Sequence, residues 1–258
     1  MINIGIIAGD GKLPVIIGKN LSLKKYNITY FLINNNKEDY SNFNTVRIKN
    51  FSIKEILNIL NKNKIDKLIL AGNIKRPSLS EISLDFETMI IVKKLFLEKK
   101  GDDQLLNSIQ KYFEDKGFKF FDWRKYCKEI FANEELLTIK KPSKNALMNL
   151  TKAKEVFKIF GKGDIGQSLI VQNQLILGLE AIEGTDKLIE RCFNYKKNED
   201  QGVLVKFNKY EQSSLLDIPT IGLNTIILLN KYNYEGLFVE KNKCIILDKE
   251  KVKDFADD

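Results

Sequence analysis

Acidic residues next to glycine turns are the side chains of this sequence best suited to do chemistry. Asp217 stands two residues before Pro219 in the stretch LDIPTIG. Four other acids stand beside glycines: Asp102, Asp103, Asp164 and Asp186. Carboxylate oxygens are the ligands that Mg²⁺ prefers, and backbone amides in glycine turns can face a phosphate. The pattern indicates magnesium-assisted phosphate chemistry, while each acid alone also suits a structural role, such as helix capping by Asp217.

The absence of one residue type narrows the chemistry further. The chain has 258 residues and no histidine, which excludes Ser-His-Asp and Cys-His catalysis, histidine general bases and histidine-ligated zinc. Cys127, Cys192 and Cys244 are far apart, so they predict neither a metal-site spacing nor a disulfide framework. Catalysis must therefore use carboxylates, Lys, Tyr, Ser or Thr, or a metal held by oxygen.

Two glycine turns in the first half of the chain are candidates for contacting a ligand. Gly9 and Gly11 follow the first predicted strand and precede a helix with Pro14 in its first turn, and Gly72 and Asn73 follow a later strand. Turns at the carboxyl ends of neighbouring parallel strands border the crevice where open α/β sheets bind ligands. The fingerprint G-x-G-x-x-G is absent, because proline takes its third glycine position. The turns thus predict a ligand-facing edge without an ordinary NAD site, the alternative being plain tight turns.

The elements that must position these residues fall into two halves. The first half alternates strands and helices, which is typical of a Rossmann-like parallel sheet covered by helices. Its predicted strands are 2–8, 28–33, 66–71 and the stretch FKFFDW, and its predicted helices are 14–24, 53–63, 85–98 and 102–115, the last with Asp102 as its N-cap.

The second half predicts a mixed α+β domain. A charged stretch with Pro142 separates it from the first half, so we expect an α/β chain with domains over 1–131 and 132–258. The predicted helices are 144–160, 186–194 and 218–231, and the predicted strands are a hairpin of 167–172 with 174–181, a strand at 202–207, and a second hairpin of 236–239 with 244–247.

Composition and charge limit the class of protein. Hydrophobic residues make up 43% and charged residues 29%, as in an ordinary soluble globular protein. No apolar run approaches the roughly 20 residues that span a bilayer, and no basic leader precedes the first strand, so we expect a cytoplasmic protein. The net charge of +8 suits an anionic membrane surface or a phosphorylated substrate. Aromatic residues do not interleave with basic ones as in RNA-binding sheets, so no nucleic-acid partner is expected.

Six short stretches, in order along the whole chain, together resemble one family. They are IGIIAGDGKLP, AGNIKRP, KKGDDQLL, GKGDIGQSLIV, LEAIEGTD and LDIPTIGLNTI. The family is that of the LpxI-type UDP-2,3-diacylglucosamine pyrophosphatases of lipid A biosynthesis. The resemblance implies a two-domain, Mg²⁺-dependent hydrolase that cleaves UDP-2,3-diacylglucosamine to UMP and 2,3-diacylglucosamine 1-phosphate (lipid X), with its active site between the domains.

The resemblance also implies roles for individual residues. Asp217, in the family's D-[LI]-P-T-I-G motif, is expected to be catalytic, in a reaction where water attacks the sugar-side phosphorus. Asp217, Asp186 and Asp164 are the first candidates for metal ligands, Asp102 and Asp103 are further candidates, and the sequence leaves open which of these acids bind the metal. The residues expected to contact the substrate are Gly9, Gly11, Gly72, Asn73, Lys100, Asp102, Asp103, Gln167, Gly184, Thr185, Lys206 and Thr220.

The chain departs from the family pattern just before the aspartate motif. The family has Lys-Pro-x-Gln and then an arginine, whereas Tyr210 and Leu215 stand at the proline and arginine positions here. An arginine beside an acid often clamps a phosphate oxygen, so the departure bears on the level of activity and not on the substrate class.

The resemblance sets the expected partners and location. The substrate carries acyl chains, so the enzyme is expected in the cytoplasm, in transient contact with the inner membrane of a Gram-negative bacterium. The sequence leaves open whether the chain forms a homodimer. The alternative function is a non-catalytic nucleotide-sugar or lipid-binding protein, which a turnover assay separates from an enzyme.

Overall fold

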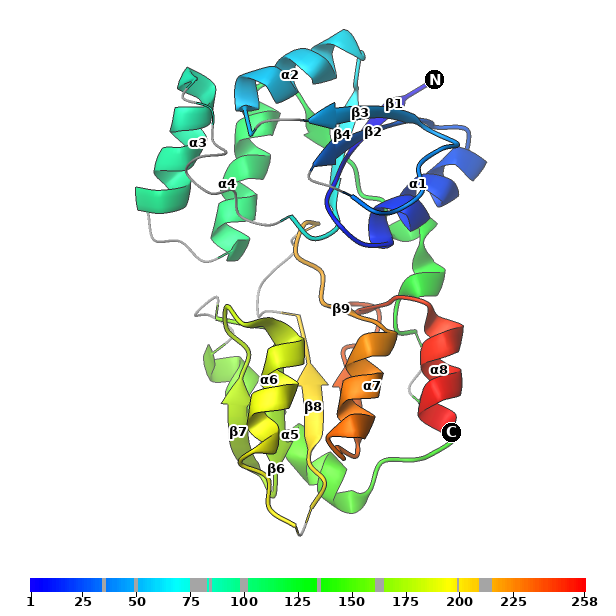
Figure 1. Ribbon diagram of the computed structural model, residues 1–258, viewed down its shortest axis with the longest axis vertical. Coiled ribbons are helices and arrows are strands. Elements are labelled where there is room, and N and C mark those ends of the chain that lie inside the picture. Colours follow the sequence, from blue (N-terminus) through cyan, green and yellow to red (C-terminus); the bar gives the residue numbers. More distant parts are fainter. Residues whose placement is uncertain are drawn as a thin grey trace. The chain divides into compact units, whose positions relative to one another are not determined.

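Two separate main sheets, one in each half of the sequence, organise this chain in the computed structural model (Figure 1). The contacts divide the chain into unit 1, Met1–Cys127, and unit 2, Lys128–Asp258. The structure describes residues 1–33, 36–48, 51–74, 83, 85–97, 102–133, 136–160, 165–198, 200–208 and 215–258, without the side chains of 94–97 and 102–105. The predicted α/β class, with a parallel N-terminal sheet and a mixed C-terminal one, is confirmed.

The sheet of unit 1 is entirely parallel, with the strand order β3-β2-β1-β4-β5. Its strands are β1 (Asn3–Ala8), β2 (Asn27–Ile33), β3 (Asn44–Ile48), β4 (Lys67–Ala71) and β5 (Lys119–Phe120). The order of the strands reverses between β1 and β4, because the chain runs outward to β3 and then returns to the other side of β1. In sheets of this kind ligands bind at the carboxyl ends of the strands at that reversal.

Helices cover both faces of this sheet. Successive side chains of a strand point to opposite faces, and most side chains of β1 and β2 are apolar, so both faces must be buried. The helices are α1 (Leu13–Leu23), α2 (Ile53–Lys62), α3 (Phe86–Leu97) and α4 (Asp102–Asp115), followed by the short η2 (Arg124–Tyr126). Phe31 of β2 lies in one core with side chains of α2, α3 and α4. Its neighbour Tyr30 points the other way and donates a hydrogen bond to the carbonyl of Pro14 in α1, 3.1 Å away. A side chain at Gly18 of α1 would collide with the Tyr30 hydroxyl, so this position requires glycine.

A carboxylate joins the start of α2 to the start of α3. Asp85 Oδ2 accepts hydrogen bonds from the hydroxyls of Ser52 and Thr88, each at 2.7 Å, and Oδ1 accepts from the Thr88 backbone amide at 2.9 Å. Ser52 is also the N-cap of α2 and accepts from the amide of Glu55. Burial acts to raise the pKa of Asp85, but these hydrogen bonds outweigh it and lower the pKa to about 2.

Unit 1 should therefore lose stability in acid partly through Asp85. Because the pKa of this carboxyl is lower in the folded state than its ordinary value of 3.8, its contribution is complete above that value and disappears as the pH falls toward about 2. We expect Asp85→Asn to be less stable than the parent at pH 6, by about 1 kcal/mol as for a lost helix cap. The difference should shrink by pH 2.5 in urea unfolding followed by circular dichroism.

Glu87→Gln is the matched control for this prediction. It removes one carboxylate charge from the same turn of α3 but leaves the Ser52–Asp85–Thr88 contacts intact. A difference between parent and Asp85→Asn that stays constant from pH 6 to 2.5 would show that the ionised carboxylate does not hold the two helix starts together.

Unit 2 has a four-stranded mixed sheet in the order β10-β8-β6-β7. Its strands are β6 (Ser168–Gln172), β7 (Leu175–Leu179), β8 (Val203–Lys206) and β10 (Gly236–Val239). β6 is antiparallel to β7 and to β8, while β10 runs parallel to β8. The predicted hairpin of β6 and β7 is confirmed, and its turn residues Asn173 and Gln174 both have positive φ.

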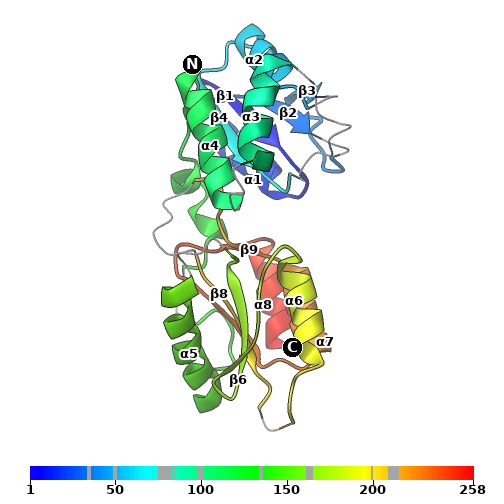
Figure 2. The same cartoon turned by 90° about the vertical axis from the view of Figure 1, so that its left-hand side faces the viewer.

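Helices lie on both faces of this sheet as well (Figure 2). They are α5 (Lys144–Phe160), α6 (Gly184–Phe193), α7 (Leu223–Lys231) and α8 (Lys249–Asp257), with the short η3 (Lys128–Ile130) near the start of the unit. Leu169 and Val171 of β6 pack in a core with α5, and Ile170 between them packs in a second core with α6 and α7. None of the helices within the described ranges combines the length and apolar character needed to cross a membrane.

Two predictions for unit 2 are wrong. The second hairpin does not exist: β10 pairs with β8, and β11 (Ile245–Ile246) forms a parallel pair with β9 (Thr220–Ile221). The helix predicted at 218–231 begins only at Leu223, because the residues after Pro219 are extended and pair with β11. Local sequence pattern does not reveal these partners, which lie far away along the chain.

Candidate functional site

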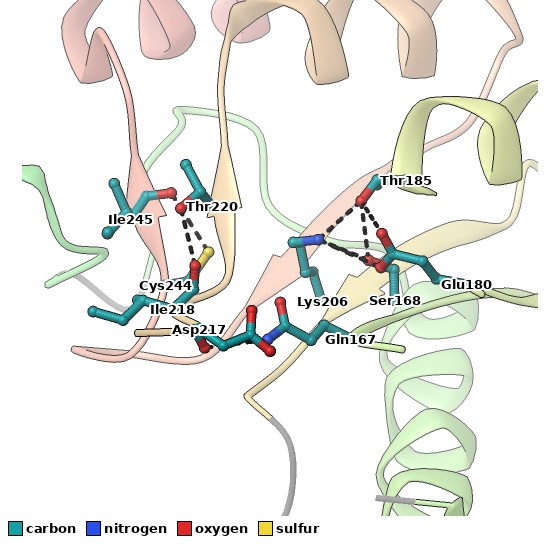
Figure 3. Close-up of polar contacts among 10 residues, drawn as sticks. All are labelled: Gln167, Ser168, Glu180, Thr185, Lys206, Asp217, Ile218, Thr220, Cys244 and Ile245. Atoms are coloured by element: carbon teal, nitrogen blue, oxygen red, sulfur yellow. Dashed lines mark hydrogen bonds and ion pairs between the residues drawn. The ribbon is translucent and has the colours of Figure 1, made fainter. Parts of the chain in front are cut away.

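Four polar side chains, three of them from two of the motif stretches and the fourth from β8, meet at one end of the sheet of unit 2 (Figure 3). Lys206 ends β8 and is paired across the sheet with Ser168, the first residue of the antiparallel strand β6. Glu180 comes directly after β7, and Thr185 lies in the first turn of α6. We call Ser168, Glu180, Thr185 and Lys206 the lysine cluster. Antiparallel pairing of β6 with both neighbours places its members together although 38 residues separate the first from the last.

The ammonium group of Lys206 is surrounded by oxygen atoms of the cluster. Its Nζ donates to Thr185 Oγ1 at 2.8 Å and to Ser168 Oγ at 3.2 Å, and it forms an ion pair with Glu180 Oε2 at 3.4 Å. Thr185 donates its hydroxyl hydrogen to Glu180 Oε1 at 2.7 Å. Lys206 is only 5% exposed. A buried ammonium needs such a partner set, since an unpaired buried charge is strongly destabilising.

All three donors of the Lys206 ammonium are directed at oxygen atoms of the protein. An ammonium has three donors, and here three protein oxygens receive them. Glu180 also neutralises its charge. The prediction that Lys206 and Thr185 contact the substrate directly stays a prediction, and it requires at least one of these bonds to be exchanged.

Asp217 lies near the same sheet end, beside Gln167 (Figure 3). Gln167 is buried, its carbonyl accepts from the amide of Phe207 at 2.9 Å, and its Nε2 donates to the carbonyl of Asp217 at 3.3 Å. The helix that follows Asp217 has Gly222 as its N-cap. The capping interpretation of Asp217 is therefore wrong.

The other predicted residues near this end have mainly local partners. Asp186, in the first turn of α6, accepts a hydrogen bond on Oδ2 from Asn224 of α7 at 2.7 Å. Thr220 donates to the carbonyl of Ile218 at 3.0 Å. Gly184 has φ +79°, a left-handed conformation that favours glycine, as α6 begins.

Some predicted site residues cannot be placed. Lys100 and Asp164 lie outside the described residues, and Asp102 and Asp103 are placed only as backbone at the start of α4. Asp102 is the first helical residue and not the residue before the helix, a shift of one position from the prediction. Among the side chains that are described, no group of three or more acidic, cysteine or histidine residues could hold a metal ion.

In unit 1 the two glycine turns meet each other. The amide of Asp10 donates to the carbonyl of Asn73 at 2.9 Å, and the amide of Asn73 donates back to the carbonyl of Asp10 at 2.8 Å. A side chain at Gly9 would lie 2.4 Å from the Asn73 carbonyl oxygen, and one at Gly72 would lie 2.8 Å from backbone oxygens of the first turn. The turns thus adjoin at the reversal between β1 and β4, and the close approach of their backbones explains these glycines.

The first turn has two further features. Asn36, which follows β2, donates from Nδ2 to the Gly9 carbonyl at 2.6 Å and to the hydroxyl of Tyr40 at 2.9 Å. Gly11 has φ +96°, and no heavy atom would contact a side chain built there. Gly11 is therefore required for its backbone conformation and not for space.

The sequence did not single out two members of the lysine cluster, Ser168 and Glu180. Both lie inside motif stretches, GKGDIGQSLIV and LEAIEGTD. The available signal was the polar residue at each strand end, since Ser168 begins β6 and Glu180 directly follows β7. Recognising it requires the strand register, which the sequence does not state.

Family models account for nearly the whole chain. The model described as the LpxI N-terminal domain matches residues 3–130, and the model described as the LpxI C-terminal domain matches residues 133–258. The chain belongs to the LpxI family. A relative within the LpxI family is the protein named UDP-2,3-diacylglucosamine pyrophosphatase LpxI of Caulobacter vibrioides, which is 28% identical over 268 aligned residues. The match covers 100% of this chain and 95% of that protein.

Proposed function

We propose that this chain is a hydrolase that cleaves the pyrophosphate bond of UDP-2,3-diacylglucosamine, giving UMP and 2,3-diacylglucosamine 1-phosphate in lipid A biosynthesis. The observation that carries the proposal is the end-to-end match to a relative with that named activity. Both halves of the chain match, so neither of the two family domains is missing. Asp217 adds support, because it lies beside Gln167 and near the lysine cluster at one end of the sheet of unit 2.

Asp217 is the proposed catalytic residue. Its carboxylate would orient the attacking water toward the sugar-side phosphorus, accept its proton, or hold a metal ion. The bond between that phosphorus and the bridging oxygen breaks, and UMP leaves with the bridging oxygen. Gly9, Gly72 and Asn73 are proposed to contact the substrate in unit 1, and Gln167 and Gly184 in unit 2.

Mg²⁺ is the proposed cofactor, and the available donors fit it. Mg²⁺ usually binds one or two carboxylates together with substrate phosphates and water, so it does not require a complete cage of protein ligands. Asp217 and Asp186 are the described acids proposed to hold it, with Asp164 as the third predicted ligand. When bound, the ion would neutralise charge that develops on the diphosphate.

The direct test is to incubate the purified protein with UDP-2,3-diacylglucosamine and Mg²⁺ and to measure UMP. Release of UMP and a sugar 1-phosphate in equal amounts is expected. Tight binding of the intact substrate with no UMP release would support the alternative, a nucleotide-sugar or lipid-binding protein.

Membrane contact gives a further prediction. The substrate carries acyl chains, and the net charge of +8 can attract the protein to an anionic surface. Each basic residue near such a surface contributes about 1 kcal/mol, within a Debye length of about 10 Å at 0.1 M salt. We expect the protein to co-sediment partly with phosphatidylglycerol-containing vesicles at about 20 mM salt, and to remain in the supernatant at about 0.5 M.

Vesicles of phosphatidylcholine alone are the control for this measurement. The protein should not sediment with them at either salt concentration. Equal sedimentation at low and high salt, or none at low salt, would show that the basic residues form a solvated coat without an oriented patch.

A further inference from the structure

The lysine cluster contains a carboxylate for which the proposed reaction has no role. Glu180 is not an expected metal ligand or substrate contact, yet its side chain is only 12% exposed and bonds two residues that are predicted to meet the substrate. We propose that Glu180 is a positioning residue for hydrolysis, which fixes the Lys206 ammonium and the Thr185 hydroxyl at the end of the sheet; this inference rests on the function proposed above.

Each of the two carboxylate oxygens of Glu180 contacts a different residue of the lysine cluster. Oε1 accepts from Thr185 at 2.7 Å, and Oε2 pairs with Lys206 at 3.4 Å, so one carboxylate fixes the start of α6 and the end of β8. Its own backbone is also fixed, since its amide donates to the carbonyl of Ser168 at 2.8 Å. A side chain at Gly166 would come within 2.0 Å of the Glu180 carbonyl oxygen, so the segment 165–168 packs directly on this residue.

Neighbouring residues of one segment contact both Glu180 and the aspartate motif. Gln167 lies between Gly166 and Ser168, and its side chain reaches the carbonyl of Asp217 at 3.3 Å. The segment that packs on Glu180 is thus the same segment that contacts the aspartate motif. Displacing a reacting group by about 1 Å can lower a rate by about 10²-fold, so a residue that fixes this segment can matter without touching the substrate.

A different role for the ion pair makes the opposite prediction. If Lys206 grips a phosphate directly and Glu180 only competes for it, removal of the negative charge would free the ammonium and tighten substrate binding. If Glu180 positions the cluster, its loss should slow turnover while leaving substrate affinity nearly unchanged. The separation of kcat from KM therefore distinguishes the two roles.

The experiment compares the full-length parent with Glu180→Gln, Thr185→Val and Thr185→Ser, using UDP-2,3-diacylglucosamine and Mg²⁺. We expect Glu180→Gln and Thr185→Val to lower kcat by about 10- to 100-fold, with KM within about threefold of the parent. Thr185→Ser keeps the hydroxyl and should restore most of the kcat that Thr185→Val loses. The double variant Glu180→Gln/Thr185→Val should be no slower than the slower single variant, since both changes break one unit.

Glu183→Gln is the matched control. Glu183 lies in the same turn, and its partly buried carboxylate pairs with Arg191 at 2.8 Å instead of with the lysine cluster. It should retain the parent kcat. A fall in KM for Glu180→Gln with kcat preserved would overturn the positioning role, and so would equal loss of kcat in Glu183→Gln.

Amide hydrogen exchange does not depend on activity, so it tests the role of Glu180 separately from the proposed hydrolysis. Exchange in β6 also shows whether the Glu180→Gln protein is folded. Exchange over residues 180–187 should be faster in Glu180→Gln and in Thr185→Val than in Glu183→Gln, with protection of β6 unchanged. A parent protein that releases no UMP would overturn the proposed hydrolysis, while exchange still decides whether Glu180 holds the turn. Unchanged exchange in both cluster variants would overturn the positioning role.

Discussion

Replacing Asp217 with alanine is expected to abolish hydrolysis of UDP-2,3-diacylglucosamine while leaving the protein folded. Loss of a carboxylate that orients water or accepts its proton lowers rates by about 10²- to 10⁴-fold, and a metal held by the same group would increase the loss. We expect kcat to fall by about 10³-fold or more in a discontinuous UMP assay.

The fold should tolerate this substitution. The N-cap of α7 is Gly222, so no helix cap is lost, and Gln167 reaches the Asp217 backbone carbonyl, which alanine retains. The free energy of unfolding should change by about 1 kcal/mol or less, typical of a side chain outside the core. Asp254→Ala, on the exposed side of α8, removes the same charge from unit 2 and should keep full activity. Near-normal turnover by Asp217→Ala would disprove its catalytic role.

Removal of divalent metal is the second change expected to abolish activity. UMP release should stop in excess EDTA and return on addition of Mg²⁺ or Mn²⁺, because carboxylate oxygens suit these ions. Zinc should not replace them. The chain has no histidine, and burial raises the pKa of the Cys192 thiol and raises that of Cys244 to about 12, so thiolate ligands are disfavoured.

The informative measurement titrates each metal into the chelated, dialysed protein and records the initial rate. A matched sample of the parent treated with the calcium-loaded chelator controls for effects of the chelator itself. Full activity in excess EDTA, or rescue by Zn²⁺ with no response to Mg²⁺, would contradict an oxygen-bound Mg²⁺ cofactor.

The elements that sequence predicted well have a strong local pattern. The helix predicted over 144–160 has those bounds in the structure, and the first hairpin turns at Asn173 as predicted. Both have local signals, an apolar stripe of helical period and an asparagine turn between apolar runs. The alternation of strands and helices in unit 1 was likewise sufficient to predict a parallel sheet.

The elements that were missed depend on partners far away in sequence. β3 was not predicted, because it has five residues, only Ile48 among them is buried, and its apolar alternation is limited to Val46 and Ile48. Pro219 suggested a helix start, but the following Thr220 pairs with Ile245 of β11. Apolar residues separated by a turn at 236–247 suggested a hairpin, yet each strand pairs with another segment. Local propensity cannot encode such pairings.

The candidate site shows the same division. The acids and glycines of the motifs were visible in the sequence, and the structure explains Gly9 and Gly72 by the close approach of two turns. The pairing of Lys206 with Glu180 was not visible, since it arises from the register of β6 between β7 and β8. The chemistry-bearing residue types can be read from a sequence, whereas their mutual contacts require the sheet.

The paired hydrogen bonds between Asp10 and Asn73 have a consequence for binding thermodynamics. These bonds join the loops after β1 and β4 into one preorganised surface at the strand-order reversal. The backbone of both loops is therefore fixed before a ligand binds. A ligand that binds on this surface would lose its own translational, rotational and conformational entropy. It would order little additional protein backbone, so the protein's share of the entropy cost of association stays small. When a rigid fragment of the ligand binds, calorimetry should then give nearly the same entropy change for the parent as for variants in which either loop is stiffened.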